Sequence, residues 1–181
     1  MRYWKLYNKF LIKKPIITNL FTGCILGFSG DFICQAIVEN KNEYDSKRLF
    51  SLTTFSTFYH GLINPIIYNY YSNLLHKNIK ISPIKFGITC SIIDNFIHVP
   101  FLYTPSFFIS TSLLQGNSLE SSIFSMKNGL IPSITACWIM WIPLQFINFT
   151  FLPNHIRPTF VNFGCLVWSV IIDHISNKYI E

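Results

Sequence analysis

Two acidic residues lie within long apolar stretches of the sequence, where a charge is costly. Asp31 follows the uncharged segment 15–30, and Asp94 precedes the uncharged segment 95–119. Gln35 and His98 each follow one of these acids by four residues, a helical spacing that brings two side chains into contact. An acid at the centre of a spanning helix costs ~2.5–3.5 kcal/mol on insertion scales. Both acids are therefore predicted to face the interior of a helix bundle or water.

Further polar residues extend this pattern to a later apolar segment, 128–156. One interpretation is a polar path through the bundle, in which acidic groups favour cations and a histidine adds pH sensitivity. The other is that these groups join helices through interhelical hydrogen bonds. The candidate pore or polar-interior residues are Asp31, Gln35, Asp94, Asn95, His98, Gln145 and Asn148.

Motifs of catalysis and cofactor binding are absent from the sequence. There is no glycine-rich phosphate loop, no HExxH pair and no nucleophile elbow. Asp94 and His98 resemble part of a catalytic dyad, but the sequence places no nucleophile beside them. The five cysteines form no CxxC pair, and their odd number does not indicate a disulfide framework. We therefore predict no enzymatic activity, no cofactor and no metal site.

The composition indicates which class of protein positions these residues. Hydrophobic residues make up 50% of the 181 residues and charged residues only 12%, against about 25% charged in soluble domains. The chain has too few charges for the surface of a soluble globule and too many apolar residues for disorder. The sequence predicts an all-α polytopic transmembrane bundle, one domain over residues 1–181, with the lipid bilayer as its partner.

Apolar runs place the helices of this bundle. A spanning helix takes ~20 largely apolar residues. The first four predicted helices satisfy this requirement, whereas the fifth has a shorter apolar core and either spans or re-enters. Prolines lie in or beside these helices at positions 65, 100, 105, 132 and 143, and such breaks occur both in gates and in purely structural helices. The predicted helices lie near 16–38, 49–75, 84–113, 124–151 and 157–176.

The amino-terminal segment is basic and amphipathic. Lys5, Lys9 and Lys13 share one helical face, and Trp4 and Tyr7 lie on another. This pattern predicts a helix in the headgroup layer, which serves either as a mitochondrial targeting helix or as a plain surface anchor. The basic residues are too few to indicate nucleic-acid binding.

Small residues in the first predicted span indicate close helix packing. Gly23 and Gly27 form a GxxxG motif, and Gly30 lies one turn further on. Glycines at this spacing let another backbone approach closely. The partner is either another helix of the same chain or a second copy in a homo-oligomer.

Ordered motifs along the whole chain resemble a known family. The first half carries Trp4-x-x-Tyr7, Pro15, Gly30-Asp31 with Gln35, Asp45-x-x-Arg48, and Pro65 in the second helix. The most specific stretch reads Trp138-x-x-Trp141-x-Pro143-x-Gln145-x-x-Asn148-Phe149, followed by Pro153, Arg157 and the late Trp168. These motifs resemble the Mpv-seventeen and twenty-two-kilodalton peroxisomal membrane protein family. Asn64, Tyr70 and Asn95 stand where that family usually has glycine, tryptophan and glutamine.

The resemblance implies a small all-helical membrane protein, usually described with four spans, in the mitochondrial inner membrane or the peroxisomal membrane. Some members behave as channels for small solutes or ions, and no catalytic residues are established. The Trp141-Ile142-Pro143 spacing resembles the peroxisomal branch, whereas the basic amino terminus favours mitochondria. We predict a channel or pore for small solutes or ions. The alternative is a non-conducting structural or partner-binding membrane protein.

Overall fold

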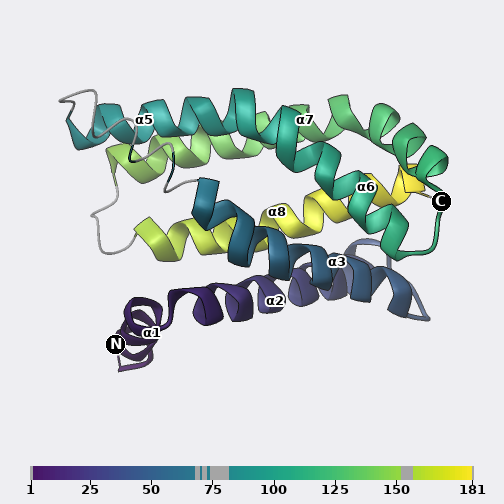
Figure 1. Ribbon diagram of the computed structural model, residues 1–181, viewed down its shortest axis with the longest axis horizontal. Coiled ribbons are helices and arrows are strands. Elements are labelled where there is room, and N and C mark those ends of the chain that lie inside the picture. Colours follow the sequence, from purple (N-terminus) through teal and green to yellow (C-terminus); the bar gives the residue numbers. More distant parts are fainter. Residues whose placement is uncertain (1, 68–69, 71–72, 74–81, 152–156, 181) are drawn as a thin grey trace.

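The computed structural model describes residues 2–67, 70, 73, 82–151 and 157–180 (Figure 1), and within these ranges the chain is helical with no strand. In the described part of the chain, three helices contain π-helical segments, labelled η. In chain order the elements are α1 (Arg2–Lys13), α2 (Pro15–Ile33), η1 (Cys34–Val38), α3 (Ser46–Phe58), η2 (Tyr59–Ile63), α5 (Pro83–Ile93), η3 (Asp94–Tyr103), α6 (Thr104–Leu114), α7 (Leu119–Thr150) and α8 (Arg157–Ile180).

Local sequence explains where several helices begin. Lys14 has extended φ because Pro15 follows it, so α1 ends there and α2 begins with the proline at its first turn. The Asp45 side chain accepts hydrogen bonds from the backbone N–H groups of Lys47 and Arg48, both at 3.0 Å, and caps α3. Gly116 has φ +97°, which glycine adopts without strain, in the short turn between α6 and α7.

Figure 1 shows α2, α3 and α8 in one half of the bundle, where α2 packs against both α3 and α8, with α5, α6 and α7 in the other half. The glycines of α2 make the first half compact. A Cβ atom at Gly23 would lie 2.6 Å from Ser56 O on α3, and one at Gly30 would lie 2.4 Å from Ser169 Cβ on α8. These glycine faces are therefore covered by helices of the same chain.

The distribution of polar side chains is that of a membrane protein. Large apolar side chains such as Phe21, Phe101 and Ile139 are exposed on the outside, whereas Arg48 and Asp173 are fully buried. Of the described residues, three helical stretches are long and apolar enough to cross a membrane: Pro15–Val38, Lys85–Leu114 and Leu119–Ile147. They match the first, third and fourth predicted spans. The second and fifth are not among them and stay predictions.

Candidate functional site

A buried ion-pair network joins the carboxyl-terminal ends of α2 and α8 to the start of α3. The side chain of Arg48 is 1% exposed. Its guanidinium lies 2.6 Å from Asp173 Oδ2, 2.7 Å from Glu39 Oε2 and 3.0 Å from Asp31 Oδ1. Because an unpaired buried charge is very costly, this single arginine determines how three elements meet. We call these four residues the Arg48 network.

Gln35 links the Arg48 network to the loop before α3. Its Nε2 donates to Asp31 Oδ2 at 2.8 Å, so the predicted contact between these two side chains is present. Its Oε1 accepts a hydrogen bond from the backbone N–H of Asp45 at 2.7 Å. The amide therefore orients Asp31 toward Arg48 and fixes the cap residue of α3.

Ion pairing governs the charge states of two groups in this network, Arg48 and Glu39. Burial opposes the charge on Arg48, but hydrogen bonds to Asp173 and Glu39 outweigh burial and raise its pKa above the ordinary value. Burial also opposes ionisation of Glu39, but the hydrogen bond and charge of Arg48, with Lys41, lower its pKa. The pair of Arg48 and Glu39 is therefore held together by opposite full charges.

Acidification is expected to destabilise the folded chain partly through Glu39. A carboxyl with a depressed folded pKa contributes stability that is present above its unfolded pKa, about 4.3, and lost as pH falls through the folded value. We expect the Tm in detergent to fall as pH drops below about 5, and to fall less steeply in Glu39→Gln. The exposed Glu120→Gln variant is the control and should follow wild type. Equal slopes for Glu39→Gln and wild type would contradict this assignment.

A second polar cluster lies where α5 passes into η3. His98 Nδ1 lies 2.6 Å from Asp94 Oδ1, so this predicted pair also makes contact. On the other side of the ring, His98 Nε2 lies 3.0 Å from the Tyr59 hydroxyl on η2. The histidine thus connects an acid on one helix with a phenol on another, which is an arrangement able to hold or pass a proton.

The other predicted polar residues have different surroundings. Asn95 donates to Ser91 O at 2.9 Å, and its own backbone carbonyl accepts the Trp138 indole N–H at 2.9 Å. It therefore bonds η3 to α7. Gln145 lines a partly open cavity together with Asp94 and His98. Asn148 lies in α7, but its side chain is outside the described residues.

Among the cavities that the described residues line, three neighbouring ones share a wall. The first, about 160 Å³, is lined by Tyr7, Asn19 and Pro65 among others. The second, about 120 Å³, is lined by Asp94, His98 and Gln145. The third, about 20 Å³, borders Asp31 and Asp173 and has room for about one water. His60 borders all three cavities. We call this set the cavity row, and it ends at the Arg48 network.

The structure does not gather the seven predicted polar residues at one point. Asp31 and Gln35 belong to the Arg48 network, whereas Asp94 and His98 line the middle of the cavity row. Sequence reasoning missed Glu39 and Asp173 as partners of Arg48. The signal available for Asp173 was its position as an acid inside the last predicted apolar helix.

Several of the residues that carried the family resemblance make contacts between helices. Trp168 Nε1 donates to the Tyr103 hydroxyl at 3.1 Å, and the Tyr7 hydroxyl lies 3.1 Å from Thr22 Oγ1. Trp141 borders the middle cavity and packs against Gly164, while Pro143 lies within α7. Pro153 lies outside the described residues, as do the side chains of Trp4 and Arg157.

Comparison with known proteins identifies the family. The model of the Mpv17 / PMP22 family matches residues 112–173. Protein SYM1 of Debaryomyces hansenii is 26% identical over 94% of this chain and 87% of its own length. Peroxisomal membrane protein 2 of Bos taurus is 26% identical over 90% of this chain and 83% of its own length. Mitochondrial inner membrane protein Mpv17 of Danio rerio is 22% identical over 97% of this chain and 97% of its own length.

The chain belongs to the Mpv17 / PMP22 family. The similarity to these relatives runs over almost the whole chain, as the ordered motifs predicted. The matched segment contains α7 and most of α8, and so includes Trp138, Trp141 and Asp173. No solved structure matches this Mpv17 / PMP22 family member. As its relatives' names indicate, it is an integral membrane protein of a family found in the mitochondrial inner membrane and the peroxisomal membrane.

Proposed function

We propose that this chain forms a pore for small ions or solutes in an organellar membrane. The cavity row is the observation that carries the proposal. Its three cavities lie between the helices and share His60 in their walls, and the middle cavity is lined by a carboxylate, histidines and amides among apolar side chains. Carboxylates and polar groups of this kind select and pass cations in channels. The proposed role needs no catalytic residue, cofactor or enzymatic step.

The same geometry suggests where the proposed pore is closed. The smallest cavity of the row, about 20 Å³, lies beside Asp31 and Asp173, and the Arg48 guanidinium binds both of those carboxylates. A hydrated ion is larger than that space, so conduction requires the ends of α2 and α8 to move apart there. The Arg48 network is thus the proposed barrier, and Asp94 is the proposed cation-attracting group.

We also propose the mitochondrial inner membrane as the location, with the peroxisomal membrane as the alternative. The relatives' names support both organelles. The helical segment Arg2–Lys13 is basic and contains no acidic residue, as expected of a helix bound to an anionic membrane surface. Expression of the full chain with a carboxyl-terminal tag and organelle markers distinguishes the two locations.

Conductance of the purified protein in planar bilayers tests the proposed pore. We expect discrete openings with a preference for cations over anions in wild type. Asp94→Asn should shift the reversal potential in a salt gradient toward that of an unselective pore, because it removes a carboxylate from the middle cavity. Glu120→Gln is the matched control, since Glu120 is exposed in the first turn of α7, and it should leave the reversal potential unchanged.

Absence of current through a bilayer that contains folded, inserted protein would contradict the proposed pore. It would support a non-conducting structural role, in which the polar side chains only hold helices together. The pairing of Asp31 with Arg48 and of Asp94 with His98 is the observation that favours that role. An unchanged reversal potential in Asp94→Asn would keep the pore but remove Asp94 from its path.

A further inference from the structure

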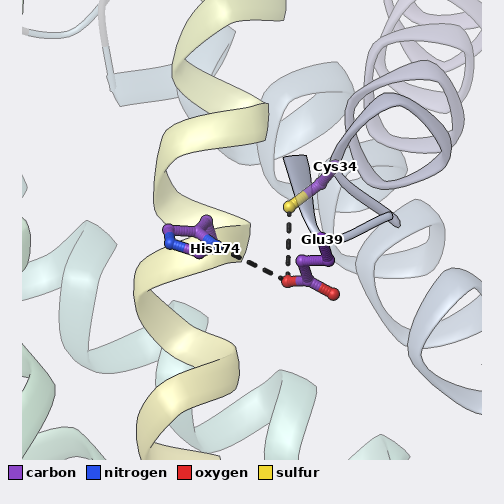
Figure 2. A group of neighbouring side chains, drawn as sticks. All are labelled: Cys34, Glu39 and His174. Carbon is purple, nitrogen blue, oxygen red and sulfur yellow. Dashed lines mark hydrogen bonds and ion pairs between the residues drawn. The ribbon is translucent and has the colours of Figure 1, made fainter. Parts of the chain in front are cut away.

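Three side chains with metal-binding atoms meet beside the Arg48 network. Figure 2 shows Cys34 and Glu39 pointing toward His174 on α8. Cys34 Sγ and His174 Nδ1 each lie 3.6 Å from Glu39 Oε1, and the three ligand atoms all lie within 4.8 Å of one another. We call these three residues the Cys34 triad.

A π-helical turn places the first two residues of the triad together. The backbone N–H of Glu39 donates to Cys34 O at 2.9 Å, which is the i to i+5 bond of a π-helix. In an α-helix, two residues five apart project about 140° from each other, because each residue turns by about 100°. The wider π-turn brings them onto the same face. Single π-turns of this kind occur frequently at functional sites.

Tertiary packing places His174, the third residue of the triad, beside the other two. His174 follows Asp173, which is bound to Arg48 through two hydrogen bonds of 3.0 and 2.6 Å. Its Nδ1 is buried and has no hydrogen-bond partner among the described residues, although it faces Glu39. A buried ring nitrogen without a partner is costly. A ligand at this atom would remove that cost.

The surrounding charges favour a cation. Three carboxylates, those of Asp31, Glu39 and Asp173, are paired with the guanidinium of Arg48, and Lys41 Nζ lies 3.6 Å from Glu39. With every one of these five side chains ionised, their formal charges sum to −1. A divalent ion that binds with loss of the Cys34 thiol proton adds one positive charge, which brings this sum to zero.

We propose that the Cys34 triad binds a divalent transition-metal ion of the zinc class. Thiolate, imidazole and carboxylate are the ligands that zinc takes in proteins, at about 2.0–2.3 Å. Around a tetrahedral ion at those distances, ligand atoms lie about 3.3–3.8 Å apart, which is close to the two 3.6 Å separations here. The side chain of His174 is 37% exposed, so water can supply the fourth ligand.

Binding of the metal ion releases one proton. Metal binding replaces the Cys34 S–H with an S–metal bond, and the thiol proton passes to solvent. Arg48 Nη2, which lies 3.3 Å from Cys34 Sγ, continues to donate to the sulfur as an outer hydrogen bond. The bound ion joins the end of α2 to α8 directly. This site depends only on the folded bundle and holds whether or not the chain conducts.

Cobalt binding to the full-length chain in detergent, after removal of metal with a chelator, tests the site. We expect one Co²⁺ per chain, with the near-ultraviolet charge-transfer band of a cobalt thiolate. Cys34→Ser should abolish the band. His174→Gln should weaken binding by at least about 10–100-fold, the loss measured for removing outer-shell partners alone. Cys24→Ser is the matched control, because Cys24 lies on the same helix outside the triad, and it should keep the band.

Zinc competition and thermal unfolding complete the test. Zinc should displace cobalt and raise the Tm of wild type, because a ligand of the folded state stabilises it, and should not raise that of His174→Gln. Since His174 is partly exposed, this variant should fold even where Cys34→Ser does not. The proposal would be overturned if folded wild type showed no cobalt thiolate band. It would also be overturned if the band persisted in Cys34→Ser, or if it was lost or shifted in Cys24→Ser.

Discussion

Replacement of Arg48 with alanine is expected to lower the free energy of unfolding by about 3–5 kcal/mol, the cost of removing one partner from a buried ion pair. The arginine is fully buried and is bound to the carboxylates of Asp31, Glu39 and Asp173. Without it, those carboxylates face one another in a medium that solvates them poorly. The ends of α2 and α8 would then separate or take up water.

Thermal unfolding in detergent, with a chelator present so that no metal compensates, measures this loss. Lys47→Ala is the control, because Lys47 is the exposed neighbour of Arg48 on α3 and should leave the Tm unchanged. Arg48→Lys should be intermediate, since an ammonium keeps the charge but not the planar fork of donors. A Tm of Arg48→Ala equal to that of wild type would show that the network does not hold these helices together.

Leucine at Gly23 is expected to destabilise the chain by about 1–3 kcal/mol or more, the usual cost of overfilling a packed site. A Cβ at this position would lie 2.6 Å from Ser56 O and 3.1 Å from Thr57 Cα. Both atoms belong to the backbone of α3, so no side-chain rotation relieves the clash. Helices α2 and α3 must therefore move apart along their length.

The loss is again measured as a lower Tm, with circular dichroism to show that helix content is kept. Ile25→Leu is the matched control on the same helix, because Ile25 is exposed on the outer face and its replacement adds no volume to the packed face. We expect that variant to behave as wild type. Wild-type stability of Gly23→Leu would mean that α2 and α3 are not in close contact at this position.

Helical spacing in the sequence determined the local polar contacts of this protein. The pairs Asp31–Gln35 and Asp94–His98 were predicted from their i, i+4 spacing, and both make hydrogen-bonding contacts in the structure. The all-helical architecture also followed from the sequence, because continuous apolar segments of about 20 residues form helices when no water is available to the backbone.

The polar clusters as wholes could not be predicted in the same way. Arg48 and Asp173 are 125 residues apart, yet they form the tightest contact of the Arg48 network. The Cys34 triad combines residues 34 and 39, brought together by a π-turn, with residue 174 of α8. The sequence contains no pattern that marks a π-turn, and an α-helical reading places residues 34 and 39 on different faces.

The reason for this division is the range over which each constraint acts. Helix geometry fixes the relation of residues three or four apart, so the sequence alone determined the paired side chains and the apolar lengths of the helices. Which helix faces which is decided by how surfaces fit, as where Gly23 admits the backbone of α3 and where one buried arginine must find its carboxylates. Only the tertiary structure therefore decided that Asp31 belongs to the Arg48 network and Asp94 to the cavity row.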